Sequence, residues 1–442
     1  SNGKIIANQL GFTATSLTNE GGSITQLGTG TMGFSVSGTL DNSNSGVFQS
    51  NSTNLTLGSA TLNNDGGTIT HAGTGTLKID AGNGTGAVTN AGGSIVSNGQ
   101  AVLSAGRVDN TSGAIGGHAG LVATVAGALN NTHGQLASNA DLNVSSGDAL
   151  TNASGVIAAA GNGTVQAASL TNSGSITAGQ ELNATVTGTL DNSGGTLSAQ
   201  TVAANAASFR NAGGVVSGNT VSTTASQLDN SHGKIIANQL GITATNLTNE
   251  HGTLTQLGTG TMGFSVGGTL DNSNGGVFQS NSTALTLAPA TLNNNGGTIT
   301  HAGTGTLTID AGNGAGSLTN VGGRIVTSGQ ASVSVGSLDN TGGTLASQGV
   351  MSATIQGTLT NTNGRLSSGS GLTASSGGEL INAGGVIGVG GAAPGSTLSL
   401  TASSIDNSGG AITNVGNGAT TIGGGSQIIN SNAGGASGMG SI

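Results

Sequence analysis

Residues 170–197 read LTNSGSITAGQELNATVTGTLDNSGGTL, and this stretch contains the pattern that decides the fold. Leu182, Ala184 and Val186 alternate with polar residues, which is the period of two expected of a strand with one buried face. A shorter apolar segment lies on either side, and glycines separate the segments. One unit therefore contains three short strands joined by turns, and its glycines and β-branched residues argue against helices.

A marker made of one apolar residue, one variable residue and Asn ends each unit and recurs along the chain. It occurs 20 times between Asn19 and Asn430, about every 22 residues. Low charge and high Gly content are also typical of disordered chains, but a regular period of this size indicates stacked structural units. We therefore predict an all-β fold, a right-handed parallel β-helix (a solenoid) of about 20 rungs with three short strands per rung.

A longer repeat lies on top of the short one. Residues 1–116 reappear as residues 231–346 at a constant offset of 230. We expect residues 1–442 to form a single continuous β-helix, built on two long repeats, 1–230 and 231–442. The first residues read as the middle of a unit, so we also expect the chain to be a fragment of a longer protein.

The composition excludes several classes of function. The chain has 86 Gly, no Cys, Trp or Tyr, and only 5% charged residues, with a net charge of -9. The missing side chains are those that build most catalytic pockets, and the absence of Cys excludes disulfides and thiolate metal sites. A net acidic chain is a poor partner for nucleic acid. No apolar run is long enough to span a membrane as a helix.

The marker asparagines are candidate structural residues. Each lies two residues after its apolar partner, so in a strand both side chains point to the same inner face. We therefore predict stacked Asn amides that form hydrogen bonds along the axis, as in other cross-β ladders. The predicted structural ladder includes, in the middle of the chain, Asn152, Asn172, Asn192, Asn211 and Asn230.

Charged and ionisable residues form no pattern that is typical of catalysis, of a metal site or of a cofactor site. None of the six histidines is paired at metal-ligand spacing, and we expect all of them to be solvated turn residues. They are His71, His118, His133, His232, His251 and His301. The middle marker residues of three successive rungs are Asp191, Arg210 and Asp229, which we expect to stack as an exposed ladder that contributes little to stability.

The longest rungs contain extra residues that should bulge from the solenoid as loops. Asn83, Asn313 and Pro394 lie in these insertions and are candidate contact residues. Recognition of glycans usually involves aromatic side chains, and the chain has only six Phe, most of them at inward-facing positions. We therefore expect these loops to be spacers.

The unit Leu190-Asp191-Asn192-Ser193-Gly194-Gly195-Thr196-Leu197 resembles the haemagglutinin repeats of the filamentous haemagglutinin family. The resemblance covers essentially the whole chain. It implies a large exoprotein that is secreted to the surface of a Gram-negative bacterium by an outer-membrane two-partner secretion transporter. Members of that family act as adhesins or as the sticks of contact-dependent growth-inhibition toxins. The motifs of the family's secretion domain and a recognisable toxin are not found in this sequence.

These observations favour a structural function over an enzyme. Our first hypothesis is a shaft that extends a distal adhesive or toxin-delivery region from the cell. The alternative is an adhesin module whose lateral surface binds a glycan or receptor on a host cell or a neighbouring bacterium. A polysaccharide-degrading β-helix enzyme is the third reading. It is disfavoured because the chain has only 7 basic residues over about 20 rungs.

Overall fold

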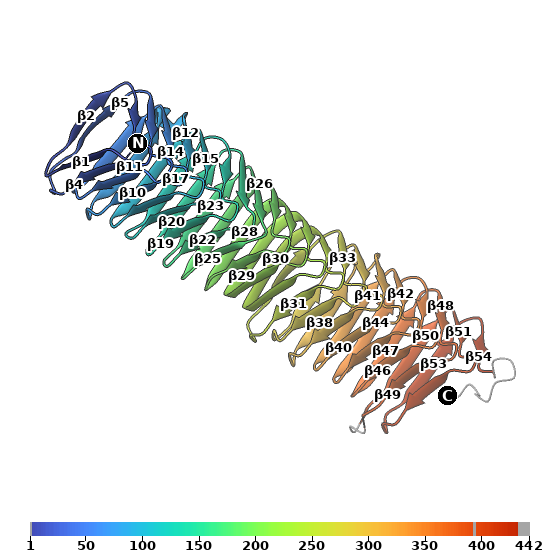
Figure 1. The fold of residues 1–442 in the computed structure, drawn as a ribbon. Coiled ribbons are helices and arrows are strands. Elements are labelled where there is room, and N and C mark those ends of the chain that lie inside the picture. Colours follow the sequence, from blue (N-terminus) through green and yellow to red (C-terminus); the bar gives the residue numbers. More distant parts are fainter. Residues whose placement is uncertain (1, 392–394, 432–442) are drawn as a thin grey trace. The chain divides into compact units, whose positions relative to one another are not determined.

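The computed structural model describes residues 2–391 and 395–431. The chain divides into two compact units, Ser1–Asn219 and Thr220–Ile442. In each unit short strands are joined by tight turns and pair in parallel, as in β1 with β4 and in β37 with β40 (Figure 1). Within the described residues the chain has one helix, the single 3-10 turn η1 (Gly82–Gly84).

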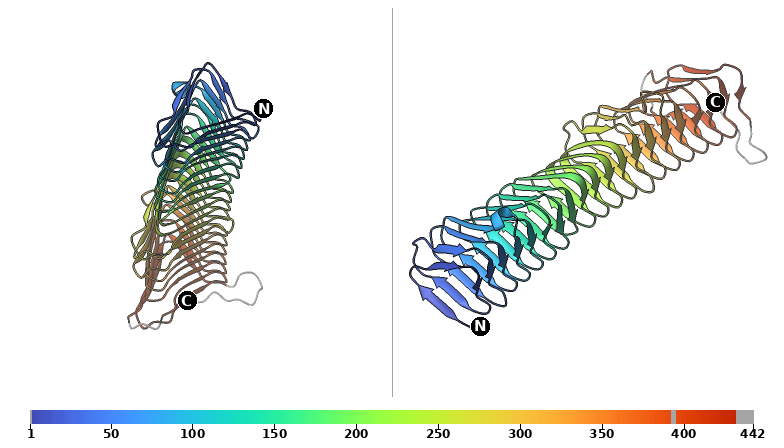
Figure 2. Two further views of the ribbon diagram at one scale, coloured as in Figure 1. Left: turned by 60° about the vertical axis from the view of Figure 1, so that its left-hand side comes forward. Right: turned by 90° about the horizontal axis from the view of Figure 1, so that it is seen from above.

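Each turn of the first unit contributes one strand to each of three layers (Figure 2). The post-turn sheet follows the Asn turn and comprises β1 (Lys4–Ala7), β4 (Ser23–Gln26), β7 (Val47–Ser50), β10 (Thr68–His71), β13 (Ser94–Ser97), β16 (Ala114–Gly117), β19 (Gln135–Ser138), β22 (Val156–Ala159), β25 (Ser175–Ala178) and β27 (Thr196–Ser198). The middle layer comprises β2 (Gly11–Ala14), β5 (Gly33–Val36), β8 (Leu55–Ser59), β11 (Thr76–Ala81), β14 (Gln100–Ala105), β17 (Leu121–Val125), β20 (Leu142–Ser146) and β23 (Gly163–Ala167). The marker sheet comprises β3 (Leu17–Thr18), β6 (Thr39–Asp41), β9 (Thr61–Asn63), β12 (Ala87–Thr89), β15 (Arg107–Asp109), β18 (Leu129–Asn130), β21 (Ala149–Asn152) and β24 (Ser169–Asn172).

The second unit repeats the three layers. Its post-turn sheet comprises β31 (Thr253–Gln256), β34 (Val277–Ser280), β37 (Thr298–His301), β40 (Arg324–Thr327), β43 (Thr344–Ser347), β46 (Arg365–Ser368), β49 (Val386–Val389) and β52 (Ala411–Asn414). The middle layer comprises β32 (Gly263–Val266), β35 (Leu285–Leu287), β38 (Thr306–Asp310), β41 (Gln330–Val335), β44 (Val350–Ile355), β47 (Gly371–Ser376), β50 (Leu398–Ala402) and β53 (Thr420–Gly424). The marker sheet comprises β33 (Thr269–Asp271), β36 (Thr291–Asn293), β39 (Ser317–Thr319), β42 (Ser337–Asp339), β45 (Leu359–Thr360), β48 (Glu379–Ile381), β51 (Ser404–Asp406) and β54 (Ile428–Ile429).

Some strands run through a corner of the solenoid without a break. They are β26 (Glu181–Asp191), β28 (Thr201–Arg210), β29 (Val215–Asp229) and β30 (Lys234–Thr248). β26 and β28 pair along both the middle layer and the marker sheet, with one register shift between Val186 and Thr189. The linker at this corner is only two residues long, so the pairing on either side of it continues with a local irregularity.

The core of each unit is a set of inward-facing apolar columns. In the post-turn sheet Ile24, Phe48, Ile69, Ile95 and Ile115 are successive partners in register, and each is buried. Outward-facing residues of the same strands are polar or small apart from Val47 and Val96, and one residue in two is buried, as a strand with one solvated face requires. The prediction of an all-β parallel β-helix with three strands per rung is confirmed in each unit.

Candidate functional site

The marker asparagines form a ladder of hydrogen bonds inside each unit. In the first unit Asn152 Nδ2 donates to Asn172 Oδ1 over 2.7 Å, Asn172 donates to Asn192 over 2.6 Å, and Asn192 donates to Asn211 over 2.7 Å. In the second unit Asn230 Nδ2 donates to Asn249 Oδ1 over 2.7 Å. All of these side chains are fully buried. The ladder therefore links each turn to the next through a polar group that water does not reach.

Asn152 is an example of a ladder amide that also bonds the backbone of two turns. Asn152 Nδ2 donates to the carbonyl oxygens of Gly155 in its own turn and Ser175 in the next turn, both at 3.2 Å. A buried amide without partners would cost roughly 1–3 kcal/mol. The Asn152 side chain thus closes the turn that follows it and also links that turn to the next rung by hydrogen bonds.

Glycine in this turn has two separate causes, which Gly92 and Gly93 illustrate. Gly92 has a φ of +62°, a left-handed conformation that side chains disfavour. Gly93 has no such φ, but a Cβ there would collide with the backbone oxygen of Asn64 in the preceding turn. Stacking at about 4.8 Å per rung leaves no space for a methyl group at this corner.

Three histidines occupy the left-handed position that Gly92 occupies in its own turn. His133, His232 and His251 have φ values of 54°, 59° and 53°, and all three are exposed. The rings of His232 and His251 stack face to face at 4.7 Å, with an angle of 9° between their planes. These residues are surface turn residues. Parallel rings do not direct two nitrogens at one point, so the pair is a poor metal site.

The expectation that all six histidines are solvated is wrong for His71 and His301, which are fully buried. His71 lies in the interior because it ends a strand in which it shares the inner face with Ile69, and period two places both side chains inside. His71 Nε2 lies 2.9 Å from the Ser52 carbonyl oxygen, and Nδ1 lies 2.9 Å from Ser97 Oγ. Burial lowers the pKa of His71, although its backbone hydrogen bonds oppose the shift.

His301 is the equivalent residue in the second unit and has the same environment. Its Nε2 lies 2.9 Å from the Ser282 carbonyl oxygen, and its Nδ1 lies 2.9 Å from Thr327 Oγ1. Burial also lowers the pKa of His301. Both imidazoles form a hydrogen bond with a carbonyl group at a corner of the preceding turn. Their function is therefore structural.

Gln26 and Gln256 are two further buried residues that the sequence analysis did not identify. Gln256 Oε1 accepts a bond of 3.1 Å from the Leu240 amide, and Nε2 donates to Gly258 O and Gly260 O at 3.1 and 2.6 Å. Gln26 makes the same three contacts in the first unit. Both glutamines share the inner face of their strand with an apolar residue two positions earlier, and this alternation was the signal that could have identified them.

Two of the three candidate loop residues, Asn83 and Asn313, lie on the surface. Asn83, in η1, is exposed and has a φ of 53°, and Asn313 is also exposed with a φ of 53°. Pro394 lies outside the described residues. Asn83 borders a groove of about 450 Å³ that also contains Asp80, which forms an ion pair of 3.0 Å with Lys78. The two loops are thus exposed, but they bring few functional groups together.

The acid and base of the predicted charge ladder are in register in the first unit. Asp191 in β26 is the direct partner of Arg210 in β28. Asp191 Oδ1 accepts hydrogen bonds from the backbone amide and the hydroxyl group of Ser193. The carboxylate therefore caps the turn that follows it, which is a structural use of the charge.

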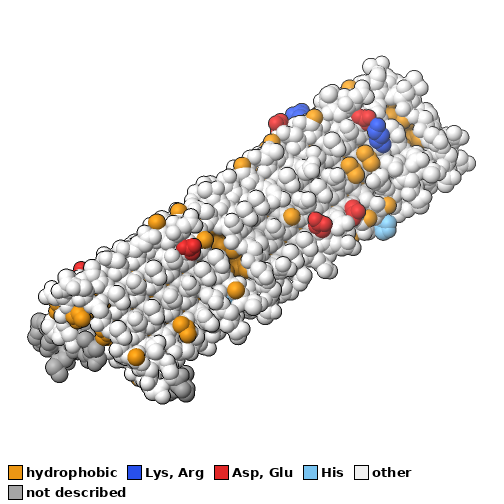
Figure 3. Space-filling model, turned by 180° about the vertical axis from the view of Figure 1, so that it is seen from behind, with side chains coloured by type: hydrophobic (Ala, Val, Ile, Leu, Met, Phe, Trp, Pro, Cys, Tyr) orange, Lys and Arg blue, Asp and Glu red, His pale blue; other side chains and the backbone are white. Residues whose placement is uncertain are grey.

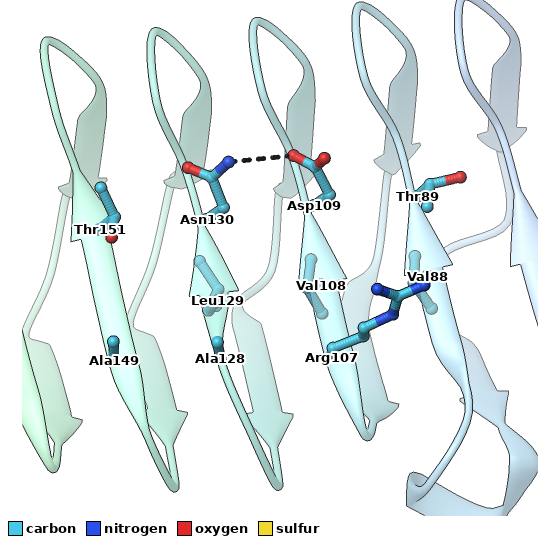
Figure 4. A pocket seen from close by; sticks show the side chains of 10 residues that line it. All are labelled: Val88, Thr89, Arg107, Val108, Asp109, Ala128, Leu129, Asn130, Ala149 and Thr151. Carbon is cyan, nitrogen blue, oxygen red and sulfur yellow. Dashed lines mark hydrogen bonds between the residues drawn. The ribbon is translucent and has the colours of Figure 1, made fainter.

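An open groove of about 340 Å³ crosses the outer surface of the marker sheet in the first unit (Figure 4). Arg107 extends from β15 toward β12, and Asp109 and Asn130 lie side by side on β15 and β18. Asn130 Nδ2 donates to Asp109 Oδ1 over 3.3 Å. The small side chains of Ala128 and Ala149 leave the space open. The groove offers one guanidinium, one carboxylate, one side-chain amide and two threonine hydroxyl groups, which suit a polar ligand and do not form a general acid–base pair.

Metal ligands do not gather anywhere in the described ranges. No group of three or more His, Asp or Glu side chains in residues 2–391 and 395–431 could hold a metal ion. On the face shown in Figure 3, charged side chains are few and scattered among uncharged ones. In the part of the chain that the structure describes, no helix has the length and apolar character needed to cross a membrane.

Comparison with known proteins identifies the repeat. The family model described as "Haemagglutinin repeat" matches residues 72–158, 158–232, 216–274, 263–304, 302–363 and 353–393. A protein named tRNA nuclease CdiA-2, from Burkholderia pseudomallei (strain 1026b), is 45% identical over 98 residues. That match spans 22% of this chain and 3% of the relative. No solved structure matches the chain.

The family matches run from residue 72 to residue 393, which is more than half of the chain, and they coincide with the stacked turns described above. The chain belongs to the haemagglutinin repeat family.

Proposed function

We propose that this chain is part of the shaft of a large exoprotein on the surface of a Gram-negative bacterium. In this proposal residues 1–442 form one continuous solenoid, and a distal adhesive or toxin-delivery region is held away from the cell. The observation that carries the proposal is the Asn ladder, exemplified by the 2.7 Å bond from Asn152 to Asn172. Every such contact joins one turn to the next and none of them forms a pocket.

The comparisons support the same proposal. Haemagglutinin repeats are typical of exoproteins that leave the cell through a two-partner secretion transporter in the outer membrane, and we propose such a transporter as a partner. The relative is named a tRNA nuclease, but the matched segment is only 3% of that protein. We therefore assign the repeat segment a supporting role and assign no nuclease activity to this chain.

The turn geometry also supports a mechanism of folding during export. Each new turn finds a preformed template of backbone groups, Asn amides and apolar side chains on the preceding turn. Repeat proteins of this kind fold by adding units to their neighbours. Successive formation of turns outside the cell would need no ATP and would keep the exported chain from sliding back.

The internal repeat allows a sharp test in the full-length protein. Deletion of residues 117–346 joins Gly116 to Ser347, and the offset of 230 keeps every layer in register. A shaft should still be exported, and electron microscopy of labelled cells should show the distal end closer to the membrane. Deletion of residues 117–336 instead joins Gly116 to Ser337, which breaks the register and serves as the control.

Two results would contradict the shaft proposal. One is an unchanged distance between the distal end and the cell after the register-preserving deletion. The other is a compact, globular particle in images of the isolated chain.

A second candidate function, lateral adhesion, is favoured by the groove beside Arg107. Loss of cell binding by this chain alone after Arg107→Ser, the residue at the equivalent position 337, would support it.

A further inference from the structure

Charges in the second unit are sorted by layer. Its three basic residues, Lys234, Arg324 and Arg365, are each the first residue of a strand on the post-turn sheet or of its continuation β30. The acidic residues of this unit lie elsewhere, in the marker sheet, in the middle layer and in a turn: Asp229, Glu250, Asp271, Asp310, Asp339, Glu379 and Asp406. The outer surface of strands β31 to β52 of the post-turn sheet therefore has basic residues and no acidic ones, in a chain whose net charge is -9.

Arg324 and Arg365 lie in one column on this surface. Thr344 is the direct partner of both, because Arg324 pairs with Thr344 in β43 and Thr344 pairs with Arg365 in β46. The two arginines are thus two turns apart, roughly 10 Å at 4.8 Å per turn. Both side chains are exposed, and Arg365 Nε donates to Ser367 Oγ over 3.2 Å. The hydrogen bonds found in residues 2–391 and 395–431 include none from the Arg324 guanidinium.

A small groove of about 190 Å³ lies beside Arg324. Thr300, Ser328 and Gln348 line this groove and add hydroxyl and amide groups. Val326 and Ala346 also line it and contribute small apolar side chains. No carboxylate lines this groove. A guanidinium of this kind binds a carboxylate with two parallel hydrogen bonds, and hydroxyl and amide groups suit the hydroxyl groups of a sugar.

We propose that this surface, around Arg324 and Arg365, binds a polysaccharide that carries carboxylate groups and lies along the column of turns. The column presents two guanidinium groups, two turns apart, to a linear polyanion. Nucleic acid fits less well, because this surface has no aromatic side chain on which bases could stack and only two arginines to neutralise phosphates. This inference goes beyond the shaft proposal and does not depend on it.

The first unit provides the matched variant. Its residues at the equivalent positions are Ser94 and Gln135, so R324S/R365Q places on the second unit two side chains that the same fold already carries. The control variant K78T/R210T also removes two positive charges, and it uses residues that the repeats carry at matching positions, Thr308 for Lys78 and Thr171 in the column of Arg210. Circular dichroism should show an unchanged β-sheet spectrum for both variants.

The test is a binding assay with the whole 442-residue chain at low salt. The probes are polygalacturonate, neutral dextran, dextran sulfate and a single-stranded oligonucleotide. We expect polygalacturonate to bind and neutral dextran not to bind. We expect R324S/R365Q to weaken that binding by about tenfold or more, the loss of at least one charge-assisted contact, and K78T/R210T to change it less than about twofold.

Four results would overturn the proposal. They are no binding of polygalacturonate, equal losses in the two double variants, binding of dextran as strong as that of polygalacturonate, and a preference for dextran sulfate or the oligonucleotide. None of these results would bear on the length or position of a shaft, which the deletion experiment measures separately.

Discussion

Asn152 and Asn172 lie on successive turns of the first unit, and the side-chain amide of Asn152 donates a hydrogen bond of 2.7 Å to the side-chain oxygen of Asn172. The same amide also donates to Gly155 O and Ser175 O. Asn152→Ala removes all three hydrogen bonds, including the one that the buried Asn172 Oδ1 accepts, and we expect the free energy of unfolding to fall by about 1–3 kcal/mol. Asn152→Asp should cost more, because a carboxylate oxygen would face three acceptors. Chemical denaturation followed by circular dichroism measures both losses.

Asn143 provides the control for this prediction. It lies on the outer surface of β20, the strand that precedes the strand of Asn152, and is exposed. Asn143→Ala should change the free energy of unfolding by no more than about 0.5 kcal/mol, as most exposed substitutions do. If Asn143→Ala and Asn152→Ala cost the same, the ladder does not contribute specifically to stability.

The turn of Ser112 and Gly113 separates the two reasons for glycine at this corner. Ser112 has a φ of 54°, so Ser112→Gly should raise the free energy of unfolding by up to about 1 kcal/mol by relieving a strained conformation. Gly113 has no room for a Cβ because the Asn90 backbone oxygen occupies that space. Gly113→Ala should therefore destabilise the protein by about 2 kcal/mol or more.

Thermal unfolding of these two variants provides the measurement. The two substitutions lie side by side and should shift the midpoint temperature in opposite directions. A loss of stability in Ser112→Gly, or an unchanged midpoint in Gly113→Ala, would show that the corner is less constrained than its geometry indicates.

The sequence was sufficient to predict the fold class because the same unit of short strands and turns repeats along the chain. Alternation around Val186 predicted strands, and the spacing of the marker predicted stacked turns. The same alternation also places His71 on the inner face beside Ile69, but the polarity of histidine favours an exposed position, and for His71 the two signals disagree. A buried polar group needs a partner, and the partner of His71 is a carbonyl group of the preceding turn. That partner depends on how far a corner opens, which no local pattern shows.

The surface chemistry was harder to predict for a related reason. The position of each charge in its turn is visible in the sequence, but whether it faces an acid or open space depends on the registers of three layers. Arg107 illustrates this. Its groove exists because Ala128 and Ala149 on the following turns are small and leave space beside it.

The buried histidines should make stability depend on pH. Burial lowers the pKa of His71 and His301 in the folded protein, whereas in the unfolded chain each has an ordinary pKa of about 6.5. Below about pH 6.5 the unfolded chain therefore binds more protons than the folded protein, and stability falls as the pH decreases through this range. Above pH 6.5 both states are neutral at these residues and the effect is absent.

Thermal unfolding between pH 5 and pH 8 measures this dependence. The double variant H71Q/H301Q should show a smaller decrease in the midpoint below pH 6.5 than the natural sequence, whatever its stability at pH 8. His118 is exposed, so His118→Gln is the matched control and should keep the original slope. A slope that is the same in all three proteins would exclude the buried histidines as its source.

Gln256 should control the order of the loop that follows it, because its side chain joins that loop to the preceding turn. It accepts a hydrogen bond from the Leu240 amide and donates to Gly258 O and Gly260 O. In Gln256→Ala the Leu240 amide loses its acceptor, and we expect its hydrogen exchange to accelerate by about tenfold or more. Residues 257–262 should also become sensitive to protease. Gln239→Ala, an exposed neighbour, should leave both measurements unchanged. Unaltered exchange at Leu240 in Gln256→Ala would mean that strand pairing alone holds this corner.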